Sequence, residues 1–256
     1  MASVHSFNEA LAKVRGLPRA TVEAYSRVLR REGLLPETKR GGGATPLTTV
    51  MAGYMLAAVM RGSPIAAAAN AREVGDLIVY DPIGNPSGAF NGEVRADPIL
   101  DCQIGMFGWP ADISFARAVG WLIDRYVDGS LAKFVDETKG LKIEVDRYWV
   151  MAKLSLHPAQ HLVDGYEDAW RLAFKGIEHP PLPERNPDGS LRRLMEINFH
   201  SPLRYEMKVS HKVDPARNRK ASQAYMRLRD EAGKFDVWGT ESITQRTLIA
   251  IAEAFK

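Results

Sequence analysis

The spacing of apolar residues over the first 80 positions predicts a series of helices. In residues 6–16 apolar side chains recur three and four positions apart, and Ser6 with Glu9 is typical of a capping box. Gly16 favours a helix end, and the Leu-Pro pair that follows it favours a turn. Equivalent spacing predicts three more helices, over residues 19–32, 46–61 and 64–76.

The chain beyond residue 112 mixes helical and strand patterns. Partial alternation of Ile, Val, Tyr and Trp over residues 141–157 predicts one or two strands. Residues 191–199 and 203–212 are expected to form two further strands, joined by a turn at Ser201-Pro202. Helices are expected over residues 113–129, 159–175, 216–232 and 240–256.

These elements predict an α+β fold with two domains. Residues 81–112 contain repeated prolines and glycines, which favour an irregular linker. We therefore expect an N-terminal helical domain with a helix-turn-helix in residues 1–80. A mixed α/β domain for dimerisation or partner binding is expected in residues 113–256.

The first two helices fit the spacing of a helix-turn-helix, in which the second helix enters the major groove of DNA. The crossing of the helices needs a small residue on the first helix, which is Ala12. The turn needs a residue that tolerates a left-handed backbone, which is Gly16. Val22 and Tyr25 supply the inward face of the second helix.

Two features of this segment depart from the usual unit. Arg15 stands where an apolar residue is usual. Few residues precede the first helix, so we expect helix 46–61 to supply the supporting core. A plain helical hairpin with a basic surface has the same spacing and is the structural alternative.

The residues expected to face outward from the second helix have the chemistry that DNA contacts require. Arginine can make bidentate contacts to guanine, and Ser or Thr can meet base edges or phosphates. We expect helix 19–32 to read the major groove, and its last arginines and the basic glycine loop after it to contact phosphates. The predicted DNA-binding residues are Arg19, Thr21, Glu23, Ser26, Arg27, Arg30, Arg31, Lys39 and Arg40.

Charge is distributed unevenly along the chain, although the net charge is only +3. Residues 1–40 hold eight basic and four acidic residues, and residues 185–229 hold eleven and four. Residues 41–184 are acidic, with twelve basic and eighteen acidic residues. The second basic segment is interpreted as a solvated face, an additional DNA contact, or a surface for RNA or an acidic partner. Its basic residues include Arg192, Arg193, Arg204, Lys208, Lys212, Arg217, Arg219 and Lys220.

Composition narrows the class of protein. The chain has 256 residues, of which 45% are hydrophobic and 25% charged, as in ordinary globular proteins. A single cysteine excludes a disulfide framework and a cysteine-based zinc finger. No apolar run predicts a membrane span or a signal peptide, so we expect a cytoplasmic protein that binds no membrane.

No residue pattern predicts catalysis, a cofactor or a metal. Neither a dinucleotide fingerprint nor a P-loop is present. His157 and His161 have the spacing of a metal pair, but Pro158 lies between them and no HExxH motif is present. Cys102 has no recognisable neighbouring base, so an inert thiol is expected. We expect no enzyme activity.

Two stretches of the sequence resemble a known group of proteins. The first is LAKVRGLPRATVEAYSRVLRREGLLP, together with the basic glycine loop and the helix that follow it. The second is SITQRTLIAIAEAF, near the C-terminus. These segments, roughly residues 9–62 and 240–255, resemble uncharacterised proteobacterial proteins associated with prophage or gene-transfer-agent regions, with an N-terminal helix-turn-helix. The resemblance implies a DNA-binding regulator, with Arg19, Thr21 and Arg27 as counterparts of recognition-helix residues.

The function expected from these observations is sequence-specific DNA binding in transcription regulation, in a phage-related setting. One unit buries little surface, so a homodimer reading two half-sites about 34 Å apart is expected on double-stranded DNA. A protein partner can also bind through residues 113–256. The alternatives are a phage DNA-packaging or replication accessory protein, and a small-molecule-binding protein or enzyme built on residues 113–256 with an aromatic-lined pocket.

Overall fold

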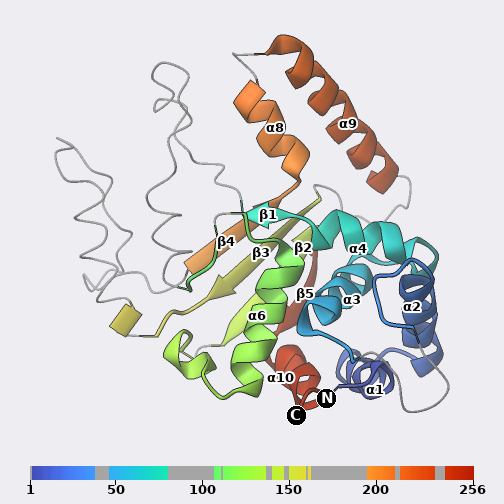
Figure 1. Ribbon diagram of the computed structural model, residues 1–256, viewed down its shortest axis with the longest axis vertical. Coiled ribbons are helices and arrows are strands. Elements are labelled where there is room, and N and C mark those ends of the chain that lie inside the picture. The colour runs from blue at the N-terminus through green and yellow to red at the C-terminus, as the bar shows by residue number, and fades with distance from the viewer. Residues whose placement is uncertain are drawn as a thin grey trace.

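A five-stranded antiparallel sheet, with helices packed against it, organises the chain (Figure 1). The structure is a computed structural model. It describes residues 2–37, 46–79, 107–110, 112–136, 140–146, 150–159, 161–162, 195–210, 214–233 and 240–256.

Helices form the first part of the chain, as the apolar spacing predicts. They are α1 (Val4–Arg15), α2 (Arg19–Arg31), α3 (Thr49–Arg61), the short η1 (Pro64–Ala66) and α4 (Ala67–Gly75). The predicted cap of the first helix is wrong, because α1 begins earlier and Ser3 is its N-cap. The Ser6 amide donates to Ser3 Oγ over 3.0 Å, and the Ser3 amide donates to Ser6 Oγ over 3.2 Å.

The strands lie in the order β1-β4-β3-β2-β5, and all neighbours are antiparallel. Ile143 of β2 lies opposite both Leu154 of β3 and Ile243 of β5, and all three side chains are buried. Alternate residues of β2 and β3 are buried, which is the period of a sheet with one covered face. The α+β class is confirmed. The strand bounds are β1 Ile78–Val79, β2 Leu141–Asp146, β3 Met151–Leu156, β4 Met195–His200 and β5 Thr240–Thr244.

The remaining helices correct two predictions. The segment after β4 is helix α8 (Pro202–Ser210), not a strand, because Ser201 Oγ accepts the Leu203 amide and Pro202 suits a first helical position. The closing helix α10 (Gln245–Glu253) is shorter than expected, because Thr240–Thr244 pairs with β2 as strand β5. The predicted helices at 113–129 and 216–232 are confirmed as α6 (Phe115–Val127) and α9 (Pro215–Gly233), and η2 is Leu131–Lys133.

Helix α3 lies at the centre of the core and crosses α6 very closely. A Cβ atom on Gly53 of α3 would lie 2.3 Å from the carbonyl oxygen of Ala116 in α6. A Cβ atom on Gly120 of α6 would lie 2.9 Å from the amide nitrogen of Val50 in α3. Each helix therefore needs a glycine where it meets the other.

Buried residues from both sides of the predicted linker belong to one hydrophobic core. Phe7, Leu29 and Met55 of the first 80 residues share it with Phe115 and Phe199. Residues 81–112, where the domain boundary is predicted, lie mostly outside the described residues, as do Cys102 and most of the predicted helix 159–175. The division into two domains stays a prediction.

Candidate nucleic-acid interface

The turn between α1 and α2 has the geometry expected for it. Gly16 has a φ of 63°, in the left-handed region that favours glycine. The Leu17 amide donates to the Ala12 carbonyl oxygen over 3.0 Å, which closes the end of α1. Pro18 precedes α2, and its carbonyl oxygen accepts the Thr21 amide over 2.9 Å. The two helices are thus joined by three residues.

The inward faces of these helices are locked into the core. Val22 and Leu29 are fully buried, and Tyr25 is nearly so. Helix α2 packs on α3 and α4, so the expected support from helix 46–61 is found. Helix α1 packs instead on α10, where the rings of Phe7 and Phe255 meet edge to face with centroids 6.3 Å apart.

Arg15 has a structural role that explains its departure from the usual pattern. Its Nη1 donates to the Ser242 carbonyl oxygen over 2.9 Å, and its Nη2 pairs with the Glu241 carboxylate. Both partners lie on β5, an edge strand of the sheet. The end of α1 is therefore fixed to the sheet by a charge-assisted contact.

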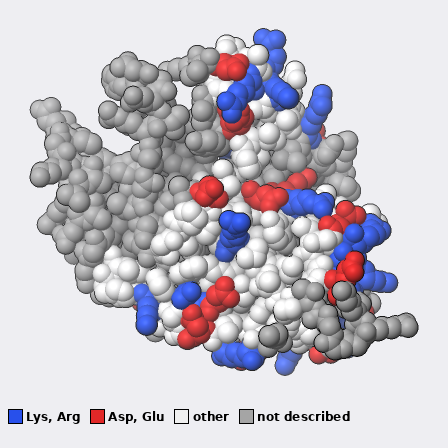
Figure 2. Space-filling view, viewed as in Figure 1, with Lys and Arg blue, Asp and Glu red and all other residues white. Residues whose placement is uncertain are grey.

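The outward face of α2 combines two small residues with two arginines. Ala20, Ala24, Arg27 and Arg31 follow at intervals of four, three and four residues, which places them along one stripe of the helix. Ala20, Arg27 and Arg31 are exposed, and Ala24 is half-buried. Figure 2 shows basic and acidic side chains side by side along the edge of the molecule where α2 and α4 lie.

Ser26 does not face outward, which corrects its prediction as a DNA-binding residue. Its side chain is fully buried, and its hydroxyl donates to Asn8 Oδ1 over 2.7 Å. Asn8 lies on α1 and is itself buried. The serine therefore joins the two helices internally and presents nothing to a ligand.

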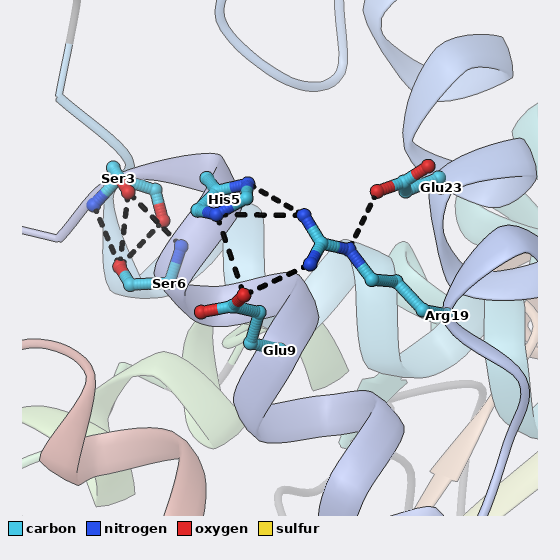
Figure 3. A network of polar contacts seen from close by, with 6 residues as sticks. All are labelled: Ser3, His5, Ser6, Glu9, Arg19 and Glu23. Carbon is cyan, nitrogen blue, oxygen red and sulfur yellow. Dashed lines mark hydrogen bonds and ion pairs between the residues drawn. The ribbon is translucent and has the colours of Figure 1, made fainter.

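Arg19 faces outward but is already held by carboxylates (Figure 3). Its Nε donates to Glu23 Oε1 over 2.9 Å, and its Nη1 donates to Glu9 Oε1 over 3.1 Å. Its Nη2 lies 3.3 Å from Nδ1 of His5. The hydrogen bond that Arg19 donates to the Glu23 carboxylate raises the pKa of Arg19 above its ordinary value. Glu23, predicted to contact DNA, thus orients an arginine in the described structure.

Three arginines and one carboxylate border an open hollow at the end of α2. The hollow has a volume of about 310 Å³ and is lined by Arg27, Arg30, Arg31 and Glu37. Arg30 lies along the helix, where its Nε donates to the Ser26 carbonyl oxygen over 3.2 Å. Arg27 makes no hydrogen bond or ion pair with another described residue. The arrangement can hold an anionic group between guanidinium groups.

Arg72 of α4 adds a cation near the end of α2 that no pattern in the sequence indicates. Its Nη1 lies 3.8 Å from Glu32 Oε2, just beyond the end of α2. Packing of α4 against α2 brings it there, and no spacing along the chain indicates this. Of the other predicted residues, Thr21 is half-buried, and Lys39 and Arg40 lie outside the described residues.

Aromatic side chains around α6 pack against one another. Trp121 packs edge to face on Phe134, with ring centroids 4.9 Å apart, and on Trp109, with centroids 5.4 Å apart. These rings fill space against one another. Within the described ranges, no three His, Cys, Asp or Glu residues lie close enough to hold a metal ion.

Comparison with protein-family models, with curated proteins and with solved structures finds no match for this chain. The resemblance to prophage-associated proteins therefore stays a prediction.

Proposed function

We propose that the chain binds double-stranded DNA with α1 and α2 acting as a helix-turn-helix, and that it regulates transcription in a phage-related setting. Helix α2 would enter the major groove. The observation that carries the proposal is the outward stripe of α2, with alanines near its start and arginines beside an open hollow near its end.

The two alanines suit the part of a helix that approaches base edges most closely. Ala20 and Ala24 leave room for the helix backbone to approach, and an alanine methyl can contact the thymine methyl group. Arg19 stands beside them and can donate two parallel hydrogen bonds to guanine once it exchanges Glu9 or Glu23 for a base.

The arginines at the other end suit the phosphate backbone. Arg27 and Arg31 project outward with exposed side chains, and Arg30 borders the same hollow. A phosphate in this hollow would meet up to three guanidinium groups, each a strong donor to phosphate oxygens, once Arg31 exchanges Glu32 for it and the Glu37 carboxylate turns away. Such contacts fix the register of the helix on DNA but carry no sequence information.

A regulator of this kind would act as a homodimer on two half-sites about 34 Å apart, because one unit covers only a short site.

The described residues include no helix that is both long and apolar enough to cross a membrane. A packaging or replication accessory protein would use the same face of α2 but would assemble into a ring or higher oligomer.

The test is selection of bound duplexes from a random pool by the full chain, followed by point variants. Deleting α1 and α2 is unsuitable, because Phe7, Leu11 and Leu29 belong to the common core. Ala20→Glu places a carboxylate where α2 approaches the bases, so it should abolish enrichment of any motif. Its control is Ala132→Glu, the same change at an exposed position of η2.

A second pair of variants tests the phosphate contact. Arg27→Gln should weaken binding to all sequences by about threefold to tenfold while the enriched motif stays the same. Its control, Lys133→Gln on η2, should bind like the unchanged chain. If the unchanged chain enriches no motif, or if Ala20→Glu enriches the same motif, α2 is not the reading helix.

A further inference from the structure

Helices α8 and α9 form a hairpin that stands off the sheet beyond β1 and β4 (Figure 1). Helix α8 follows β4 directly, and α9 packs back along α8. Ala221 and Tyr225 of α9 are buried, and the Asn218 side-chain amide donates to the Met207 carbonyl oxygen on α8. These residues mark the inner face of α9.

The opposite face of α9 carries an exposed row of cations. It consists of Arg219, Lys220 and Arg227, which are exposed. At 3.6 residues per turn, these three positions lie on the side of the helix opposite Ala221 and Tyr225. None of the three makes a hydrogen bond or ion pair with another described residue. No acidic residue occurs between Pro215 and Arg229 in the sequence. Among the described residues, the charge of these three side chains is therefore uncompensated over about two turns of the helix.

Arg217, on the same helix, differs from these three residues because a carboxylate neutralises its charge. Its Nη2 donates to Glu206 Oε2 over 2.9 Å, and its Nε pairs with the other carboxylate oxygen. This pair joins α9 to α8 and raises the pKa of Arg217. One basic residue thus pairs across the hairpin, whereas the three on the outer face pair with no described residue.

We propose that the outward face of α9 binds the phosphate backbone of double-stranded DNA. The inference deepens the proposed function and rests on it, because the duplex is the one that α2 would read. The contact would be independent of sequence, and Arg219, Lys220 and Arg227 would each neutralise phosphate charge.

The composition and spacing of this face favour DNA over a protein partner. Lys220 and Arg227 are seven positions apart, a distance of about 10 Å along the helix, which corresponds to about three phosphate steps of one strand at about 3.4 Å each along the DNA axis. Gln223 lies between them and adds a neutral donor of the kind that contacts phosphates. The centre of a protein interface is rich in aromatic and apolar residues. Where side-chain exposure is described on α9, Met226 is the one large apolar residue that is exposed, so this face does not have that composition.

The experiment measures binding of the full chain to a random-sequence duplex by fluorescence anisotropy over a range of salt concentrations. The test variant combines Arg219→Gln, Lys220→Gln and Arg227→Gln. It should bind about tenfold or more weakly at about 0.1 M salt, and the slope of log K against log salt should become shallower by about 2 to 3. Preference for a selected motif over random DNA should not change.

The matched control removes the same three charges elsewhere. Arg117→Gln, Lys133→Gln and Arg246→Gln alter exposed positions of α6, η2 and α10. This variant should keep the affinity and salt slope of the unchanged chain to within about twofold. Equal behaviour of the two triple variants would overturn the assignment of the contact to α9.

The outcomes separate this inference from the proposal for α2. If the α9 variant loses affinity while Ala20→Glu keeps its motif, the α9 contact stands and the reading role of α2 fails. If Ala20→Glu loses the motif and the α9 variant binds normally, α2 stands and this inference fails. Tighter binding of duplex RNA, or equal competition by polyglutamate of the same charge, would also overturn it in favour of RNA or an acidic protein.

Discussion

Helix α2 is held on several sides by the core, whereas among the described elements α9 packs mainly on α8. Val22, Tyr25 and Leu29 bury one face of α2 against α1, α3 and α4. The arginine at its start is bound by two glutamates. The outer cations of α9 have no such partners among the described residues.

This difference matches the two kinds of contact that a DNA-binding protein needs. Reading base edges requires side chains placed to within a fraction of an ångström, so a reading helix benefits from a rigid support. Neutralising phosphates requires charge near the backbone but little positional accuracy, so a helix on a hairpin is sufficient. The molecule therefore has one basic helix that the core holds on several sides and one that, among the described elements, is supported mainly by α8.

The largest effect should come from breaking the support of α2 at the crossing of α3 and α6. Gly53→Leu forces a side chain into the backbone of Ala116, so we expect a loss of at least about 3 kcal/mol in the free energy of unfolding. Urea denaturation followed by circular dichroism measures it. Ala132→Leu adds a similar side chain at an exposed position and should change the stability little.

A smaller substitution at the same position tests the cause. Helix propensity alone would make Gly53→Ala stabilising by about 1 kcal/mol. The 2.3 Å approach to Ala116 reverses that sign, so the variant should be less stable than the unchanged chain. A more stable Gly53→Ala variant would show that the crossing is not close-packed.

The next largest effect should be acid destabilisation at the base of the α8–α9 hairpin. Burial, followed by the nearby charge of Arg204, lowers the pKa of His200 from 6.5 to about 4. Nδ1 of the neutral His200 ring lies 3.2 Å from Nη1 of Arg204. Between these two pKa values the unfolded chain binds a proton that the folded chain does not, so stability is lost as the pH falls from about 6.5 to 4.

The loss attributable to His200 should reach at most about 3 kcal/mol near pH 4. Urea unfolding at several pH values measures it, with His200→Gln as the control because glutamine keeps a polar side chain but does not titrate. The stability difference between the two chains should shift in favour of His200→Gln as the pH falls. Parallel curves would show that His200 is not the group responsible.

The sequence predicts the local helices of the N-terminal part well, because their apolar spacing and the glycine turn are encoded within short windows. The strand at 203–212 was predicted wrongly, because alternation over a few residues does not register that Ser201 and Pro202 favour the start of a helix. Strand β5 was missed because only pairing with β2, about a hundred residues earlier, defines it.

In the candidate site, too, contacts between residues far apart in the sequence could not be predicted. Helical spacing places Val22 and Tyr25 inside, and it places Ser26, four residues after Val22, on the same face. The prediction that Ser26 faces outward followed its polarity instead of this spacing and is wrong. Only the packing of α1 on α2 brings Asn8 close enough to bind it. Likewise the glutamates around Arg19 are ten residues before it and four after it, and only the turn brings Glu9 near.

The buried hydrogen bond between Ser26 and Asn8 gives the third prediction, which sharpens the rigid side of the comparison. Ser26→Ala leaves the side-chain oxygen Oδ1 of Asn8 without its donor, so we expect a loss of about 1 to 3 kcal/mol in stability. A double-mutant cycle with Asn8→Ala should give a coupling of about 1 kcal/mol. DNA affinity measured well below the unfolding temperature should stay unchanged. If Ser26→Ala weakens DNA binding but leaves the stability unchanged, Ser26 contacts DNA after all.

The smallest effect should come from releasing Arg19, because its partners are exposed and such ion pairs contribute little to stability. Glu9→Gln with Glu23→Gln keeps the shapes of the side chains but removes two negative charges that compete with DNA for the guanidinium group. We expect DNA affinity to rise by about threefold to tenfold at low salt and less at high salt.

The control for this variant is Glu196→Gln with Glu253→Gln, two exposed glutamates that each pair with a lysine elsewhere on the surface. It removes the same charge, so it separates a local effect at Arg19 from a general gain in positive charge. Equal gains in the two double variants would mean that the glutamates do not restrain Arg19 in particular. A loss of affinity in the first variant would mean that Glu9 and Glu23 orient Arg19 for DNA, and that α2 reads its site with this arginine already held in place.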